Sequence, residues 1–370
     1  MELRHDEYND LSRCILQFPL AKLLPMNRNY PTQLTQLAVC LGAVWSLAVT
    51  ERCDVLADSV QGYEQVIPAM GTTVTLAAFS SQSSIVERAF AEARSEITRL
   101  VTVLSDYDDE SELSQLNRTM AQGSPIRVSA ELWTVLEASD RWHQVTSGAL
   151  DPSVGMLTRL WRQHRRKGTL PSDAAIADAL ASSGWRHLRL NANDRSVACN
   201  RTGVSLDLGA IAKGYIVDRA FDILQQHGLK SCMVNAGGDL RCGDAPPNRS
   251  GWRIGIASFS KDGPPMRILQ VANAAIATSG DLWQYTIVQG RRRSHILDPK
   301  SGIGVEGPMS FSAIASTAMD ADAAATALSV LGVQVGCELA ERLPEIEAMA
   351  IFLVEPQNAI RYTATSGFAR

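Results

Sequence analysis

Two oxygen-bearing side chains in the C-terminal part of the chain have the spacing of a metal site on a helix. Asp322 and Thr326 are four residues apart, and residues at that separation lie on the same helix face. A carboxylate beside a hydroxyl offers hard oxygen ligands, which suit Mg2+ or Ca2+ better than Zn2+. An acidic residue in a first helical turn also serves simply to complement the helix dipole. Spacing alone leaves both interpretations open.

Two glycine-containing segments could bring the backbone close to a ligand. The sequence SLDLGAIAKGY (205–215) predicts a strand, a glycine and a helix start, where free N–H groups and Lys213 could hold phosphate. Such joints also occur in ordinary packing. Gly237-Gly238, followed by Asp239, is typical of a turn in which a ligand or another backbone replaces side-chain volume. It is not the G-x-G-x-x-G fingerprint of dinucleotide-binding folds.

His295 and Tyr107 are candidates for proton transfer and ring stacking. Strand alternation in RRRSHILDPKSG predicts that Arg293, His295 and Leu297 share one face and that a proline-initiated turn follows. An imidazole there suits proton transfer or phosphate contact, although a histidine on a strand surface also needs no function. Tyr107, in an acidic segment, either stacks on a planar ring or caps a core.

The elements that must position these residues mix strands and helices without a regular βαβ period. Helices are predicted at 84–103, 131–146, 210–227 and 319–331, and strands at 205–208 and 231–235, with a strand pair around Gly71 and a hairpin over 283–297. This order predicts an α+β fold rather than a doubly wound sheet.

The amino-acid composition argues against some classes of partner and metal site. The 370 residues are 45% hydrophobic and carry a net charge of −4, which is enough for a large core and argues against nucleic acid as a partner. The seven cysteines form no C-x-x-C pair and no cluster at zinc spacing. Disulfides and buried free thiols both remain open for the four that follow residue 190.

The N-terminal part has the pattern of an export signal. Leu37–Val49 is an unbroken apolar run that is too short to span a bilayer comfortably, and Met26 is an alternative start to Met1. Small residues near Ala57 offer a cleavage site. We therefore expect residues 1–57 to form a signal peptide or membrane anchor and residues 58–370 to work in the periplasm. A buried hydrophobic helix is the remaining alternative.

From about Met70 to Phe368, the motif sequences and their order along the chain resemble those of the ApbE family of FAD:protein FMN transferases. The matching segments are MGTTVTL, LSDYDDESELSQLN, SGALDPSVGMLTRLW, LDLGAIAKGY, VNAGGDLRC with WRIGI, AIATSGD, SHILDPKSG, DADAAATALSVLG and EAMAIF with SGF. The resemblance implies a single flavin transferase domain of mixed sheets and helices, similar to the T-fold. The sequence departs from the family pattern at Gln115-Leu116, where Arg-Phe is commoner in the family. Lys213 stands at a position that varies among family members.

The resemblance also implies roles for individual residues. It places these residues at the flavin dinucleotide: Met70, Tyr107, Ala149, Leu150, Asp151, Asp207, Lys213 and Ile296. Asp322 and Thr326 match the metal ligands in D-A-x-x-T, Ala210 matches a further ligand through its carbonyl, and His295 matches the histidine associated with transfer.

The implied activity is Mg2+-dependent transfer of FMN from FAD to a threonine or serine hydroxyl of another protein, with release of AMP. The implied acceptor is an exported domain of a redox membrane protein. Within the resemblance, the alternative is a relative that binds FAD, or hydrolyses it to FMN and AMP, without modifying protein. From another class, the alternative is a periplasmic solute-binding protein, which would need neither the D-A-x-x-T helix nor a metal.

Overall fold

The structure is a computed structural model that describes most of the chain from residue 60 onward. The described residues are 60–120, 123–256, 258, 263–281, 285–288, 291–354 and 359–368. The apolar run Leu37–Val49 lies outside them, so the predicted signal segment and the division after residue 57 stay predictions. Every helix within the described residues is too short or too polar to span a bilayer.

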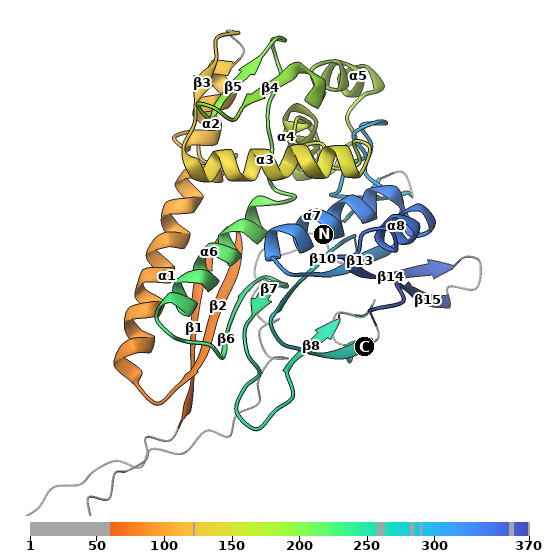
Figure 1. The fold of residues 1–370 in the computed structure, drawn as a ribbon. Coiled ribbons are helices and arrows are strands. Elements are labelled where there is room, and N and C mark those ends of the chain that lie inside the picture. Colours follow the sequence, from red (N-terminus) through yellow and green to blue (C-terminus); the bar gives the residue numbers. More distant parts are fainter. Residues whose placement is uncertain are drawn as a thin grey trace, which may run out of the picture. The chain divides into compact units, whose positions relative to one another are not determined.

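An eight-stranded antiparallel sheet forms the centre of the described part, in the order β1-β2-β6-β7-β10-β13-β14-β15 (Figure 1). Its strands are β1 Gln61–Ala69, β2 Thr72–Ser80, β6 Cys232–Ala236, β7 Asp239–Cys242, β10 Ala274–Gly280, β13 Met309–Ala315, β14 Glu347–Val354 and β15 Ala359–Ala364. Leu76 and Ala78 of β2 are fully buried on one face, and Ala77 between them is buried on the other. The sheet is therefore covered on both faces.

Helices cover the first face (Figure 1). They are α1 Ser83–Leu104, α6 Ala212–Gln226, α7 Ala318–Leu331 and, beside α7, α8 Val333–Ala340. α1 buries a stripe at helical spacing that includes Phe90, Ile97 and Leu100, and α6 packs beside it. The predicted helices at 84–103 and 319–331 are therefore confirmed.

A second layer covers the other face. β8 (Trp252–Ile256) pairs with β9 (Arg267–Val271) and buries Trp252, Ile254 and Ile256 together with Phe368 from the C-terminal end. The remaining hairpin pairs β11 (Tyr285–Val288) with β12 (Arg291–Ser294).

A smaller group of elements is drawn at the top of Figure 1. It contains α2 Glu112–Thr119, α3 Ala130–Val145, α4 Gly155–Lys167, α5 Asp173–Ala181, a 3-10 turn Trp185–His187 and the three-stranded sheet of β3 Ile126–Arg127, β5 Ser196–Cys199 and β4 Leu188–Asn191. Antiparallel sheets with helices segregated on one face confirm the predicted α+β class.

Small residues let α7 lie unusually close to its neighbours. Its six alanines at 318, 321, 323, 324, 325 and 327 are fully buried. At the contact with α6, a Cβ on Gly214 would fall 2.2 Å from the carbonyl oxygen of Ala318. This close approach brings the first turn of α6 against the first turn of α7.

Asp218 of α6 anchors the start of α7. Its carboxylate accepts hydrogen bonds from the backbone N–H groups of Ala318 (2.8 Å) and Met319 (2.9 Å) and pairs with Arg241 (2.9 Å). Burial raises its pKa from an ordinary 3.8 to about 6, against the opposing effect of these donors. The folded state therefore holds a proton that the unfolded chain releases near pH 4.

We expect this buried carboxyl to make stability depend on pH. A folded-state pKa above the unfolded value stabilises the protein below pH 4, and that contribution is lost as the pH rises through 6. Relative to Asp218→Asn, the wild type should lose on the order of 3 kcal/mol between pH 4 and pH 7. Urea unfolding of both proteins at the two pH values measures this difference. An equal pH dependence in both would contradict the assignment.

One predicted strand is absent. Ser205–Leu208 makes only a single parallel bridge, between Ser205 and Val154. The side chain of Asn117 accepts a hydrogen bond from the Leu206 N–H (2.7 Å) and donates one to the Leu206 carbonyl (2.9 Å), which replaces the strand ladder. The helix that follows begins at Ala212 rather than Ala210.

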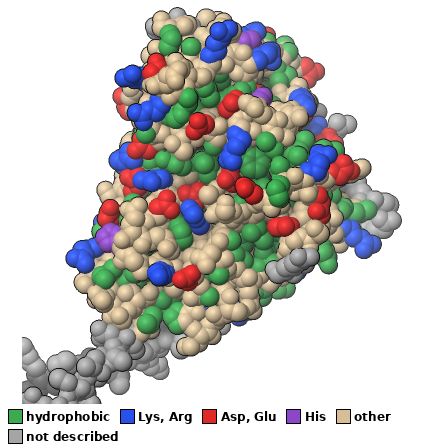
Figure 2. All heavy atoms as spheres, viewed as in Figure 1, with side chains coloured by type: hydrophobic (Ala, Val, Ile, Leu, Met, Phe, Trp, Pro, Cys, Tyr) green, Lys and Arg blue, Asp and Glu red, His purple; other side chains and the backbone are tan. Residues whose placement is uncertain are grey.

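The cysteines that the structure describes form no disulfide with one another. All four cysteines among the described residues (Cys199, Cys232, Cys242 and Cys337) are free thiols, three of them buried. Figure 2 shows Lys and Arg interspersed with Asp and Glu over one face, without a field of a single sign.

Candidate active site

The middle of α7 carries a buried carboxylate and a hydroxyl one turn apart. Asp322 is 2% exposed, and its Oδ2 accepts a hydrogen bond from the Gly214 N–H at 3.1 Å. Thr326 is partly buried, with its Oγ1 2.9 Å from the hydroxyl of Ser279 at the end of β10. The helical spacing therefore places both predicted metal ligands between α6 and the sheet.

Lys213 lies between two buried carboxylates. Its Nζ forms a close ion pair with Oδ2 of Asp239 and lies 3.8 Å from Oδ1 of Asp322. Asp239, the first residue of β7, is 3% exposed, and its Oδ1 accepts a hydrogen bond from the Thr278 N–H. From the sequence, Asp239 is predicted only as part of a turn. The signal that could have identified it is a carboxylate directly after two glycines.

The electrostatics of this group favour a cation. Burial raises the pKa of Asp322, while the charge of Lys213 and the Gly214 N–H act to lower it. One ammonium faces two carboxylates, so negative charge is in excess. A divalent cation would relieve the cost of keeping Asp322 ionised in this buried position.

The residues present fit Mg2+ better than zinc. The available donors are carboxylate and hydroxyl oxygens, and no group of three or more His, Cys, Asp or Glu residues at metal-binding distance occurs in the described residues. Ala210, the third predicted ligand, lies in the loop four residues before Gly214 and just before α6. The structure thus brings its chain segment to the same end of α6 as Asp322.

Met70 lies at a turn beside this group. Met70 and Gly71 connect β1 to β2, and both have positive φ angles of 54° and 69°. Next to this hairpin, the Gly237 N–H donates to the Thr73 carbonyl at 3.1 Å. A Cβ on Gly237 would fall 2.5 Å from Oγ1 of Thr72, so the turn before Asp239 requires glycine.

A second group of predicted residues surrounds Arg162 of α4. The guanidinium Cζ lies 4.1 Å from the centroid of the Tyr107 ring. Its Nη2 pairs with Asp207 at 2.7 Å and its Nη1 with Asp106 at 2.5 Å. Burial and the nearby Asp207 raise the pKa of Asp106. Arg162 was not predicted as a site residue, because a helix with a basic end usually faces solvent.

The segment Ala149–Asp151 is joined to this second group through the backbone. Ala149 and Leu150 are buried, and Oδ1 of Asp151 accepts hydrogen bonds from the N–H and hydroxyl of Ser153. The Asp207 N–H donates to the Pro152 carbonyl at 2.8 Å. Oδ1 of Asp207 also accepts a hydrogen bond from the Gly209 N–H. Lys213 of the first group follows Asp207 by six residues, at the start of α6, so this short segment connects the two groups.

His295 does not lie on a strand face, which corrects the predicted alternation. β12 ends at Ser294, whose hydroxyl accepts a hydrogen bond from the Ile296 N–H at 3.0 Å and turns the backbone. Ser294, Ile296 and Leu297 are all buried, whereas His295 is partly exposed. The segment rests on α4, because Leu297 belongs to the same apolar cluster as Trp161.

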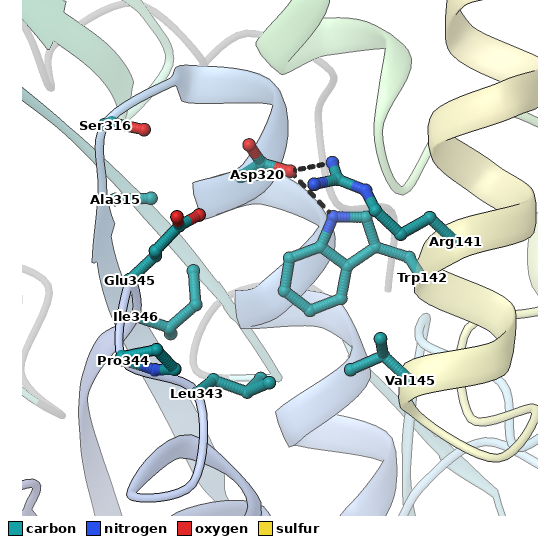
Figure 3. A pocket seen from close by; sticks show the side chains of 10 residues that line it. All are labelled: Arg141, Trp142, Val145, Ala315, Ser316, Asp320, Leu343, Pro344, Glu345 and Ile346. Carbon is teal, nitrogen blue, oxygen red and sulfur yellow. Dashed lines mark hydrogen bonds and ion pairs between the residues drawn. The ribbon is translucent and has the colours of Figure 1, made fainter.

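A surface pocket lies away from both groups, on the side of α7 that faces α3 (Figure 3). Asp320 there accepts hydrogen bonds from Arg141 and Trp142, and its position two residues before Asp322 puts it on nearly the opposite helix face. The pocket has a volume of about 130 Å3 and contains no predicted site residue.

Comparisons with known proteins agree on one family. The family model described as "ApbE family" matches residues 70–350. The chain is 30% identical to the FAD:protein FMN transferase of Treponema pallidum (strain Nichols), over 82% of this chain and 88% of that protein. It is 33% identical to the FAD:protein FMN transferase of Vibrio cholerae serotype O1 (strain O395), over 81% and 90%.

Solved structures give the same result. The flavin transferase ApbE from Vibrio cholerae superposes with a TM-score of 0.75 at 29% identity, covering 84% of this chain and 99% of that one. The apo form of the flavinyl transferase ApbE from Pseudomonas stutzeri superposes with a TM-score of 0.74 at 29% identity, covering 84% and 96%.

Proposed function

Because the chain belongs to the ApbE family, we propose that this enzyme is an FAD:protein FMN transferase that moves FMN from FAD to a threonine or serine hydroxyl of an acceptor protein. The observation that carries the proposal is the buried Asp322, one turn from Thr326 and facing the α6 N-terminus and Lys213. Burying an ionisable carboxylate is costly for a helix that serves packing alone, and Lys213, 3.8 Å from Asp322, also pairs with a second buried carboxylate, Asp239.

The reaction is a group transfer without a change in the redox state of the flavin. The acceptor hydroxyl oxygen forms a bond to the phosphorus on the FMN side of the pyrophosphate. The bond from that phosphorus to the bridging oxygen breaks, and AMP leaves with this oxygen and the electron pair. The hydroxyl proton passes to a base, for which His295 is our candidate.

Asp322, Thr326 and the carbonyl of Ala210 are the proposed holders of Mg2+. When bound, Mg2+ neutralises charge on the pyrophosphate and makes AMP a better leaving group. Lys213, held by Asp239, supplies a positive charge at the same end of α6. Phosphoryl transfer depends mainly on such positioning and charge stabilisation.

The remaining predicted residues are proposed to contact the rest of FAD. Tyr107 and Asp207 belong to the group around Arg162, and Ala149–Asp151 adjoins it through Pro152. Met70 lies at the hairpin turn next to Gly237. Ile296 is buried beside the candidate base. The first and second groups would thus bind different parts of one extended dinucleotide.

The test is mass spectrometry of a threonine-containing acceptor domain incubated with FAD, Mg2+ and this protein. We expect the acceptor to gain the mass of an FMN group and AMP to appear in equal amount. FMN and AMP without a modified acceptor would indicate a pyrophosphatase. FAD binding that persists after chelation, with no AMP released, would indicate a solute-binding protein. Either result would overturn the proposal.

We further propose that the enzyme works in the periplasm, as a secreted protein or anchored on the outer face of the inner membrane, on an exported domain of a redox membrane protein. The support is the apolar run Leu37–Val49 with small residues near Ala57. We expect cell fractionation and N-terminal sequencing to find a mature periplasmic chain that begins near Asp58. Intact residues 1–36 on a soluble cytoplasmic protein would contradict export.

A further inference from the structure

Arg162 joins residues from two separate segments of the candidate site. Its two terminal nitrogens pair with Asp106 (2.5 Å) and Asp207 (2.7 Å), which belong to distant parts of the sequence. Its side chain is only 23% exposed. Because both terminal nitrogens are engaged by carboxylates, the guanidinium plane is fixed in orientation.

The Tyr107 ring lies against this fixed plane. The guanidinium carbon is 4.1 Å from the ring centroid, which is within cation–π distance. The Tyr107 N–H is held by the Ser105 hydroxyl at 3.1 Å. Tyr107 is nevertheless 72% exposed, the highest value among the large apolar side chains described as exposed. One ring face is therefore supported, while most of the side chain stays open to solvent.

A supported and exposed aromatic ring is suited to stacking on a planar ligand. The carboxylates that hold Arg162 make it a poor partner for phosphate, because its terminal nitrogens are occupied. Arg165, one turn further along α4, is a second cation near Tyr107, but it is exposed, and solvent weakens its attraction for an anion. The surroundings thus favour a ring of the dinucleotide here, with the pyrophosphate nearer Lys213 and Asp322.

We propose that Arg162 is a positioning residue that fixes the Tyr107 ring and the Asp207 carboxylate as one rigid platform, on which a planar ring of the flavin dinucleotide stacks. This inference rests on the proposed function and adds to it a residue that acts through Tyr107. The shared chemistry is stacking of a flat heteroaromatic ring, which the isoalloxazine and the adenine of FAD both offer.

The test is a double-mutant cycle on FAD binding, followed by the quenching of flavin fluorescence. Arg162→Lys keeps the charge for both carboxylates but removes the planar fork. We expect it to raise the Kd for FAD about fivefold in the wild-type background, which is the size of a cation–π contact at a partly exposed site. In a Tyr107→Leu background the same change should raise the Kd by a clearly smaller factor, because the ring is absent and Arg162 acts only through Asp207. Riboflavin and AMP as separate probes identify the ring that stacks.

Two further variants serve as a control and as a substitute for Arg162→Lys. Arg159→Lys, at an exposed position on the same helix, is the matched control and should leave the Kd unchanged. Asp106→Ala, which removes the acceptor on one side of the guanidinium, should weaken FAD binding only where Tyr107 is present, and it serves if Arg162→Lys does not fold. If Arg162→Lys raises the Kd equally in both backgrounds, or in neither, the inference is overturned. The proposed function would still stand in that case, provided that the wild type binds FAD and releases AMP. Absence of FAD binding by the wild type would instead overturn the proposed function and this inference with it.

Discussion

Replacing Asp322 by alanine is expected to reduce the Mg2+-dependent rate of FMN transfer by at least about a hundredfold, as is usual when a group that stabilises transition-state charge is removed. Asp322 is the most buried carboxylate of the first group, and burial raises its pKa in the absence of a divalent cation. The variant leaves Lys213 paired with Asp239, so the local positive charge remains but the proposed metal ligand is lost. Steady-state AMP release over a Mg2+ titration measures the effect.

FAD affinity should fall much less than the rate in the same variant. The platform of Arg162 and Tyr107 is built from α4 and the segment after α1, and no contact joins it directly to Asp322 in the described residues. A binding measurement with the variant therefore separates loss of catalysis from loss of the substrate site.

Asp320→Asn is the matched control for Asp322→Ala. Asp320 is on the same helix, but it contacts Arg141 and Trp142 on the side of the surface pocket (Figure 3). Asparagine can still accept the hydrogen bond from the Trp142 indole, so folding should persist and turnover should change less than about threefold. Full turnover in a folded Asp322→Ala protein would show that this end of α7 is structural.

Local sequence patterns were sufficient to predict α7 and the first hairpin. The D-A-x-x-T segment lies in an alanine-rich run that has high helix propensity, so a helix was expected and the two side chains had to share a face. The turn at Met70-Gly71 follows from glycine and the β-branched residues around it. In both cases the signal lies within about ten residues of the site it positions.

The failures of prediction arise where a distant side chain or a hydroxyl replaces the regular backbone pairing. Leu206 is bonded by the amide of Asn117, from a different helix, and so Ser205–Leu208 does not form a strand. His295 follows a turn closed by the hydroxyl of Ser294, which period-two alternation cannot anticipate. Neither partner can be identified from local propensity.

Two candidate site residues could not be identified from sequence for a related reason. Arg162 lies in a helix whose last turn is basic, a pattern that normally marks a solvated face, and its partners Asp106 and Asp207 come from separate segments. Asp239 was visible after Gly237-Gly238, yet its pairing with Lys213 depends on β7 lying beside α6. Arg162 and Asp239 join the candidate site through tertiary contacts, which a local sequence motif does not reveal.

Replacing His295 by asparagine separates the proposed base from the metal-binding group. Its segment is held by the Ser294 turn and by Leu297, which packs with Trp161, so asparagine should leave the local structure in place. If His295 takes the proton of the acceptor hydroxyl, the variant should lose roughly 10²–10⁴ in turnover while the Kd for FAD changes little. His227→Asn is the control, because His227 pairs with Glu92 at the far end of α6 and should not affect transfer.

The pH dependence of the rate distinguishes a base from a phosphate-binding histidine. A base must be deprotonated to act, so the wild-type rate should rise with pH through the range in which imidazole groups ordinarily titrate, near pH 6.5. This rising limb should be absent in His295→Asn and present in His227→Asn. A histidine that only holds a phosphate oxygen would instead weaken FAD binding about tenfold when replaced and leave the shape of the profile unchanged. FAD titrations and pH–rate profiles on the three proteins therefore decide the role, and the second pattern would refute His295 as the base.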